Sequence, residues 1–172
     1  NLFNMAKRFH DNIPDVVKPT TGASNAKELL FPKLDSGFVV ATAGNKSIGR
    51  SHTIQLFQGS EIGFWPNAEE HTAGIMQAVA DAPGTEVVLE STANGIGNIF
   101  YKMWIAAETG KSDFECVFIP WFWHEEYTRT PPMGWRPPKP WEDYGVNHDL
   151  TPAQIYWAYL KNRDMATATA QS

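Results

Sequence analysis

Strand-like and helix-like segments alternate between residues 53 and 120, and this alternation limits the possible folds more than any other feature of the sequence. The predicted strands are 53–58, 85–89 and 114–119, and the predicted helices between them are 67–79 and 98–109. Parallel strands need a crossover connection, which is usually a helix. The pattern therefore predicts an α/β fold with a mostly parallel sheet and helices on both faces. In such a sheet, functional side chains gather at the carboxyl ends of the strands.

Further elements are expected before this region. Apolar side chains with helical spacing predict a first helix that Pro14 ends and that packs against the rest of the chain. Its apolar positions are Leu2, Met5, Phe9 and Ile13. Two short strands are expected at 28–31 and 37–43, because both runs are apolar and bounded by turn-forming residues. Within the alternating region, Asn67 is expected to cap the helix that follows it.

The segment 128–148 is rich in proline, which excludes a regular helix or an interior strand. The prolines concerned are Pro131, Pro132, Pro137, Pro138 and Pro140. We expect an extended connector whose side chains Trp135 and Trp141 hold it against the folded chain. A last helix is expected from Pro152 to about residue 162, with Thr151 or Asp149 as its cap.

Composition excludes several classes of protein. The 172 residues carry a formal net charge of -5, so no overall cationic field favours nonspecific capture of DNA. The single cysteine, Cys116, excludes an internal disulfide and a cysteine-cluster metal site. The longest apolar runs, such as 38–43, are far shorter than the roughly 18 residues that a membrane-spanning helix needs, so no membrane association is expected.

A first cluster of polar residues, Gly59-Ser60-Glu61, follows the predicted strand 53–58. The carboxylate of Glu61 would project from the edge of the sheet. Phosphate-hydrolysing α/β domains place a water-orienting base beside a magnesium ion in this way. The ordinary alternative is a solvated glutamate at the end of a strand.

A second cluster, 90–95, follows the predicted strand 85–89 and reads Glu-Ser-Thr-Ala-Asn-Gly. Asn94 and Gly95 allow left-handed backbone geometry, and the hydroxyl groups of Ser91 and Thr92 can form hydrogen bonds with a phosphate. A tight connection between a strand and a helix is the alternative interpretation.

A third cluster, Gly49-Arg50-Ser51, precedes the strand that leads to Glu61. The guanidinium group of Arg50 is suited to a phosphate or a carboxylate, because it donates two parallel hydrogen bonds. An ordinary surface arginine is the alternative.

Taken together and in this order, the three clusters resemble the large subunit of the terminase of tailed bacteriophages, within its ATPase domain. The matching patterns are GRSxxxxxxxxSEIxFW, ESTANGxGNxFYxxW and FxxxFIPWFxxxEY, and the resemblance covers about residues 1–161. It implies a P-loop NTPase core of the ASCE type. The strand before the acid would be the Walker B strand, and Glu61 would activate the attacking water. The second cluster would be the coupling motif, with Thr92 as the sensor of the γ-phosphate and Ser91 and Asn94 beside it.

The resemblance also implies cofactors and partners. ATP and Mg²⁺ would be bound in the complete protein, with Ser60 and Glu61 holding the metal through water and Arg50 contributing to the nucleotide site. The partners would be double-stranded DNA, the terminase small subunit, the portal protein and further copies of the chain on the procapsid. The protein would act in the host cytoplasm as part of the viral DNA-packaging motor and would not be a structural protein of the virion.

The sequence departs from the family pattern at two points. Many such ATPases have Asp immediately before the catalytic Glu, where this chain has Ser60, so its hold on magnesium would be weaker. No G-x-x-x-x-G-K-S/T loop is present, and the nearest imitation, at 43–47, precedes a strand and lacks the helix that a phosphate cradle needs. We expect that loop upstream of Asn1 and the nuclease domain beyond Lys161. The chain alone is therefore expected to show no ATPase activity.

The expected division of the chain follows from this reading. It comprises a partial ATPase domain at 1–127, the proline-rich connector at 128–148, a helix toward a nuclease domain at 149–163 and a disordered tail at 164–172.

Two other functions are compatible with the same residues. In the first, Glu61 and Glu90 act as paired carboxylates of a stand-alone hydrolase, which requires their carboxyl groups to lie roughly 5 to 9 Å apart in a shared cleft. In the second, the chain is a noncatalytic interaction module that docks through its connector. The terminase interpretation requires Glu61 and Thr92 to emerge side by side from one parallel layer and to face a common pocket.

Overall fold

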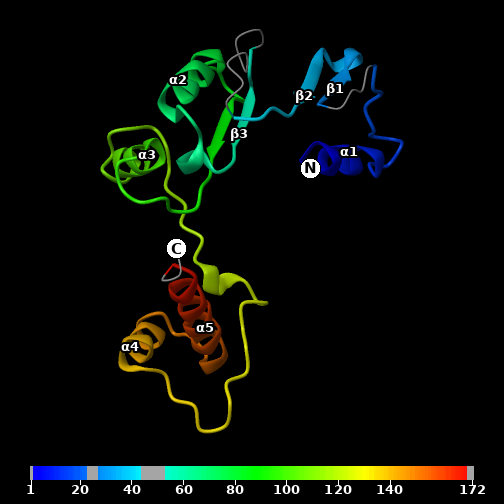
Figure 1. Ribbon diagram of the computed structural model, residues 1–172. Helices are drawn as coiled ribbons and strands as arrows, with labels where there is room; N and C mark the ends of the chain where they lie inside the picture. Colours follow the sequence, from blue (N-terminus) through cyan, green and yellow to red (C-terminus); the bar gives the residue numbers. More distant parts are fainter. Residues whose placement is uncertain (1, 23–26, 44–52, 170–172) are drawn as a thin grey trace. The chain divides into compact units, whose positions relative to one another are not determined.

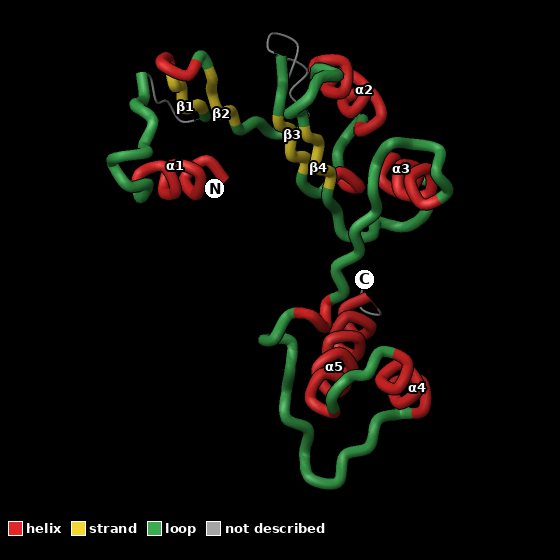
Figure 2. The backbone as a smooth tube through the Cα atoms, turned by 180° about the vertical axis from the view of Figure 1, so that it is seen from behind, coloured by secondary structure: helices red, strands yellow, loops and turns green. Residues whose placement is uncertain are grey.

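The computed structural model describes residues 2–22, 27–43 and 53–169. The chain divides into two compact units, Asn1–Glu115 (unit 1) and Cys116–Ser172 (unit 2). Over the described residues the fold is mixed α/β, with five α-helices and two sheets of two strands each (Figures 1 and 2). No helix in these residues is both long and apolar enough to cross a membrane.

Unit 1 begins with helix α1 (Leu2–Asp11) and an antiparallel hairpin. Strands β1 (Glu28–Phe31) and β2 (Ser36–Val39) pair with Leu29 opposite Phe38, and the short 3-10 turn η1 (Pro32–Leu34) joins them. The second strand predicted from the sequence thus begins one residue earlier than expected and ends at Val39.

The buried face of α1 differs from the predicted one. Leu2, Met5 and Phe9 are 59%, 50% and 66% exposed, whereas Phe3 and His10 are buried. His10 explains the difference, because Nε2 lies 2.9 Å from the carbonyl oxygen of Pro19 and the ring packs against Phe31. The apolar spacing predicted the helix correctly but the wrong face.

The second sheet of unit 1 is a parallel pair. Strands β3 (Leu56–Gly59) and β4 (Glu86–Leu89) run side by side, with Gly59 opposite Leu89. Helix α2 (Ala68–Ala78) forms the crossover between them, and helix α3 (Ile99–Glu108) follows β4. This part of the chain has the alternating order and the parallel pairing that the sequence predicted.

The expected larger parallel sheet is absent from the described residues, where β3 and β4 pair only with each other and the β1–β2 hairpin is antiparallel. The predicted strand 114–119 has no regular secondary structure. Val117, Phe118 and Ile119 are 69%, 72% and 72% exposed. A strand is stabilised by the ladder it forms with a neighbour, and strand-like composition does not provide that neighbour.

The two helices of the alternating region begin where the sequence predicted. Asn98 caps α3, since its side chain accepts a hydrogen bond from the backbone N–H of Tyr101 at 3.0 Å. Asn67 precedes α2 but has a left-handed backbone (φ 50°) and makes no cap bond with its side chain. On α2, Thr72 and Ile75 are the buried positions.

Unit 2 contains a helix that the sequence did not predict. Helix α4 (Lys139–Asn147) lies inside the expected connector 128–148. Pro138 is its N-cap and Pro140 lies in its first turn. Backbone nitrogen atoms of the first turn donate no intrahelical hydrogen bond, so a proline there costs none, and its fixed φ suits the helix. These prolines begin the helix instead of preventing it.

Helix α5 (Pro152–Thr169) is the centre of unit 2 and extends past the expected end near residue 162. The connector packs on it as expected, with the ring of Trp135 4.7 Å from Tyr156 and that of Trp141 6.2 Å from Tyr159. Gly145 of α4 is buried against Ile155, where a side chain on the glycine would overlap the Ile155 methyl group.

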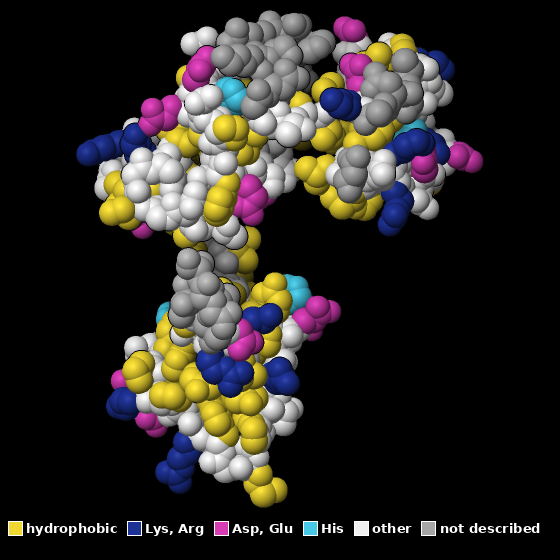
Figure 3. All heavy atoms as spheres, in the orientation of Figure 1, with side chains coloured by type: hydrophobic (Ala, Val, Ile, Leu, Met, Phe, Trp, Pro, Cys, Tyr) yellow, Lys and Arg dark blue, Asp and Glu magenta, His cyan; other side chains and the backbone are white. Residues whose placement is uncertain are grey.

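A column of aromatic rings completes the core of unit 2. Trp157 stacks on Trp121 at 5.2 Å and on Tyr127 at 4.6 Å, and Tyr127 in turn stacks on His124 at 4.4 Å. Trp121, in the 3-10 turn η3 (Trp121–Trp123), also donates from Nε1 to the hydroxyl group of Tyr144 at 3.1 Å. The visible surface of the unit mixes apolar side chains with charged ones (Figure 3).

Replacing Thr151 with Ala is expected to destabilise unit 2 by about 1 kcal/mol. Thr151 and Gln154 form a reciprocal cap of α5, in which Gln154 Oε1 accepts from the Thr151 N–H at 2.9 Å and Thr151 Oγ1 accepts from the Gln154 N–H at 3.3 Å. Urea denaturation followed by amide NMR signals of α5 measures the change. Thr151→Ser keeps the hydroxyl group and should remain near wild type; equal losses in both variants would show that the cap is not the cause.

Candidate functional site

The carboxyl ends of β3 and β4 bring two polar loops together. Beyond the last paired residues, Gly59 and Leu89, the backbone N–H of Glu90 donates to the Gly59 carbonyl at 2.9 Å. The backbone N–H of Ile62 donates to the Glu90 carbonyl at 3.2 Å. The loop that follows β3 therefore leaves the sheet in contact with the loop that follows β4, as parallel pairing requires.

Glu61 is held in an uncommon backbone conformation at this edge. Its φ of 55° and ψ of 42° lie in the left-handed region, which a non-glycine residue seldom adopts. The 3-10 turn η2 (Ile62–Phe64) starts immediately after it, and the side chain of Ile62 is completely buried. Trp65 fixes the other end of the turn by donating from Nε1 to the Ser60 carbonyl at 2.8 Å. The turn thus anchors Glu61 from both sides.

The carboxylate of Glu61 faces Thr92. Its Oε2 accepts from Thr92 Oγ1 at 3.1 Å and from the Thr92 N–H at 3.3 Å. Ser91 Oγ lies 3.4 Å from the same oxygen but only 2.8 Å from the Thr92 carbonyl. A hydroxyl group has one proton to donate, so the shorter contact is the hydrogen bond of Ser91. Thr92 is therefore the main partner of Glu61.

Ser91 and Asn94 brace the second loop against the η2 turn. The Gly63 N–H donates to Ser91 Oγ at 3.1 Å, and Asn94 Nδ2 donates to the Gly63 carbonyl at 2.7 Å. A Cβ atom on Gly63 would lie 2.9 Å from Ser91 Oγ. The close approach of the loops therefore depends on a glycine at this position.

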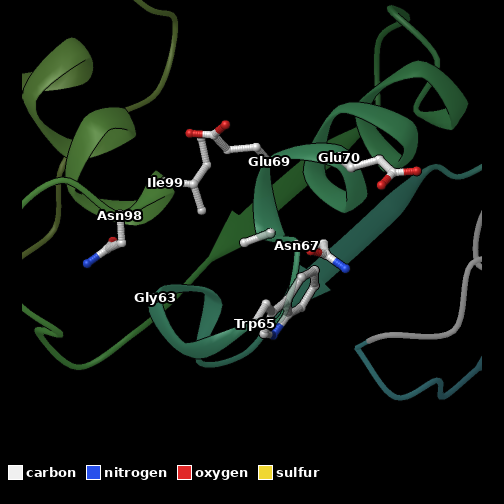
Figure 4. Close-up of a pocket in the computed structure, with 8 residues that line it drawn as sticks. Gly63, Trp65, Asn67, Glu69, Glu70, Asn98 and Ile99 are labelled. Carbon is white, nitrogen blue, oxygen red and sulfur yellow. The ribbon is translucent and has the colours of Figure 1, made fainter.

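A cleft of about 470 Å³ lies beside this cluster, between η2 and the first turns of α2 and α3 (Figure 4). The lining residues include Gly63, Trp65, Glu69, Glu70, Asn98 and Ile99, and do not include Glu61 or Thr92. Two carboxylates at the cleft disfavour a polyanion such as a triphosphate. The common pocket expected for Glu61 and Thr92 is thus not this cleft.

Lys102 of α3 forms an ion pair with Glu69 of α2, one of the residues that line the cleft. The hydrogen bond from the Lys102 ammonium group, with its charge, lowers the pKa of Glu69 below its ordinary value. The pair links the two helices at neutral pH and is lost as the pH falls through that lowered pKa, because Glu69 then becomes neutral.

The structure brings together four of the predicted residues, namely Glu61, Ser91, Thr92 and Asn94. Ser60 adjoins them, but its described contact is made by the backbone carbonyl. Arg50 lies outside the described residues. In the described contacts, Glu90 takes part through its backbone, as donor to Gly59 and acceptor from Ile62, and it does not line the cleft.

Gly63 and Asn98 belong to the same network and were not predicted as site residues. Gly63 contributes only backbone atoms, which carry no signal in the sequence. Asn98 stands in the matched pattern ESTANGxGNxFYxxW and directly before a helix. The place before a helix indicates a cap without indicating a link to the loop.

A magnesium site fits these residues only together with a nucleotide. In the part of the chain that the structure describes, no group of three or more His, Cys, Asp or Glu side chains is suited to hold a metal ion. Ser60 and Glu61 supply hard oxygen atoms, but Mg²⁺ demands six oxygen ligands and usually takes the others from phosphates and water. Ser60 and Glu61 alone therefore do not complete a magnesium site, and phosphates and water would have to supply the other ligands.

No family model matches the sequence. The resemblance to terminases consequently stays an interpretation of the three motifs.

Replacing Gly63 with Ala is expected to separate the two loops. The added methyl group would meet Ser91 Oγ at 2.9 Å, and relief of the overlap weakens the hydrogen bonds from the Gly63 N–H and from Asn94. We expect a loss of stability in unit 1 of about 1 to 3 kcal/mol, as for other overpacked sites. Urea denaturation measures it, with Gly74→Ala as the control because nothing lies within 4 Å of the Cβ position at Gly74. A loss no greater than that of the control would contradict the close packing.

Proposed function

We propose that this chain contains the hydrolytic and coupling part of a terminase large subunit, the ATPase that drives double-stranded DNA into a viral procapsid. One observation supports it most. The carboxylate of Glu61 and the hydroxyl group of Thr92 lie 3.1 Å apart where two adjacent parallel strands end. Nucleotide-hydrolysing α/β domains act at that edge of the sheet.

In the proposed reaction, Glu61 orients a water molecule and accepts its proton as the water attacks the terminal phosphate of ATP. The bond from that phosphorus to the bridging oxygen breaks, and ADP leaves. Its position is set by the buried Ile62 on one side and by the Thr92 hydrogen bonds on the other. Ser60 and Glu61 would hold Mg²⁺ through water, and the metal would neutralise charge on the phosphates. Thr92 is in contact with Glu61. In the proposal, Thr92 senses the loss of the phosphate, and the loop that carries Thr92 responds.

The proposal includes a larger parallel sheet in the complete protein. The β3–β4 pair already has the required direction, and the exposed apolar residues Val117, Phe118 and Ile119 have the composition of a buried strand. Burying these side chains against a further strand would remove them from water, which favours pairing. The proposal also requires a G-x-x-x-x-G-K-S/T loop outside the present sequence.

The proposed partners are the terminase small subunit, the portal protein and further copies of the chain on the procapsid. The proposed place of action is the host cytoplasm. The chain has a formal net charge of -5, so its DNA contacts must be local or come from the rest of the protein.

The proposal is tested by ATP hydrolysis with the product of the complete open reading frame. We expect that the reading frame encodes the phosphate loop upstream, that its product hydrolyses ATP with Mg²⁺ and that the present chain alone does not. Absence of the loop, or absence of turnover by the complete product, would reject the assignment.

A further inference from the structure

Asn98 uses both ends of its side-chain amide. Its Oδ1 accepts from the Tyr101 N–H at 3.0 Å, which caps α3. Its Nδ2 donates to the Asn94 carbonyl at 2.8 Å and to the Gly95 carbonyl at 3.1 Å. One side chain thus holds the start of a helix and the loop before it.

The backbone of the loop is shaped for this contact. Gly95 and Gly97 have φ values of 69° and 94°, in the left-handed region that glycine adopts without strain. These two residues turn the chain back, so that the carbonyl groups of Asn94 and Gly95 meet the Asn98 amide. Residues with side chains would resist the same turn.

The contacts continue from Asn98 to Glu61. Asn94, whose carbonyl binds Asn98, donates from its own side chain to the Gly63 carbonyl at 2.7 Å. Gly63 lies in the turn that begins directly after Glu61, and the same loop presents Thr92 to the Glu61 carboxylate. Asn98 therefore stabilises the loop whose other end holds Glu61.

Capping alone does not account for asparagine at this position. Asp, Ser and Thr also accept a hydrogen bond from the helix N–H groups and cap about as well. Only an amide combines that acceptor with two N–H donors, and here the donors bind the loop. The residue type thus matches both tasks.

We infer that Asn98 is a positioning residue that joins the Ser91–Gly95 loop to α3. By holding this loop in place, Asn98 keeps Thr92 against Glu61. The Lys102–Glu69 ion pair connects α3 with α2 at the surface. The effect on catalysis rests on the proposed function, whereas the effect on the loop does not.

Asn98→Asp separates the two tasks, because it keeps the cap and removes both donors. In this chain, hydrogen exchange measured by NMR is expected to rise about tenfold at the Gly63 and Thr92 amides, as for loss of a hydrogen bond of typical strength, and to stay unchanged at the Tyr101 amide. Asn98→Ala, which loses both functions, should raise exchange at all three.

Asn67→Asp is the matched control. It makes the same chemical change before α2, where the side chain forms no cap bond, and should leave exchange at Gly63 and Thr92 unchanged. Unchanged exchange at these amides in Asn98→Asp, or an equal rise in Asn67→Asp, would overturn the inference whether or not the protein is an ATPase.

A second measurement uses the product of the complete open reading frame. Asn98→Asp should lower kcat for ATP hydrolysis about tenfold or more with KM for ATP unchanged, because misplacing Glu61 affects the reaction and leaves nucleotide binding intact. An unchanged kcat would overturn the catalytic part of the inference. An inactive wild-type protein would reject the proposed function instead, and the exchange experiment would still decide the role of Asn98 in the loop.

Discussion

Replacing Glu61 with Gln is expected to lower kcat for ATP hydrolysis by the complete protein about 10²- to 10⁴-fold, the usual contribution of a general base. Gln has the size of Glu and its side-chain oxygen can still accept from Thr92 Oγ1, so the loops should stay in place. The amide cannot take the proton of the attacking water. A steady-state assay of phosphate release measures kcat.

Glu90→Gln is the control for this change. Glu90 is an exposed carboxylate at the end of the neighbouring strand, and its described contacts are those of its backbone. If Glu61 acts alone as the base, Glu90→Gln keeps near wild-type turnover. If the two residues work as a carboxylate pair, both changes should abolish hydrolysis of a glycoside-like substrate, and the wild-type protein should not hydrolyse ATP. The two variants therefore separate the ATPase from the stand-alone hydrolase.

Local patterns predicted the parts of the fold that local interactions determine. The α3 helix begins at the residue after Asn98 because a cap and the first helical N–H groups lie within a few residues of each other. The parallel β3–β4 pair was predicted because one helix joins two apolar runs of similar length. The contact between Glu61 and Thr92 follows from that pairing, since both loops leave the same edge of the sheet.

Features that depend on a distant partner were not predicted. The composition of 114–119 favours a strand, but in the described residues no neighbour pairs with it, and the segment stays exposed. On α1, spacing identified an apolar face, whereas the contacts of His10 with Pro19 and Phe31 select the buried one. Such choices depend on what the rest of the chain presents, which periodicity cannot reveal.

The start of α4 was missed for a different reason. Proline excludes a helix only at interior positions, whereas Pro138 and Pro140 occupy the cap and the first turn of α4, where proline is tolerated. The effect of a proline depends on its position relative to a helix start. The aromatic packing of Trp135 and Trp141 on α5 then fixes the connector, as their apolar rings predicted.

Replacing Ile62 with Ala is expected to destabilise unit 1 by about 2 to 5 kcal/mol, the range measured for deleting a buried Ile or Leu side chain. Ile62 is the one large side chain with 0% exposure among the described residues, and its Cδ1 atom packs close to Gly59 at the end of β3. Its removal leaves a cavity beside the end of β3, next to the η2 turn that follows Glu61. Urea denaturation followed by the amide NMR signals of β3 and β4 reports on unit 1 alone.

The same experiment distinguishes an anchor from an ordinary apolar residue. Leu56, also in this region and 68% exposed, is the control, and Leu56→Ala should change stability by about 0.5 kcal/mol or less. Ile62→Val keeps most of the side chain and should cost about 0.5 to 1.5 kcal/mol. Because the η2 turn positions Glu61, hydrogen exchange at the Thr92 amide should rise in the order wild type, Ile62→Val, Ile62→Ala. Equal stability of Ile62→Ala and Leu56→Ala would mean that the buried side chain does not hold the turn, and Glu61 would then need another anchor.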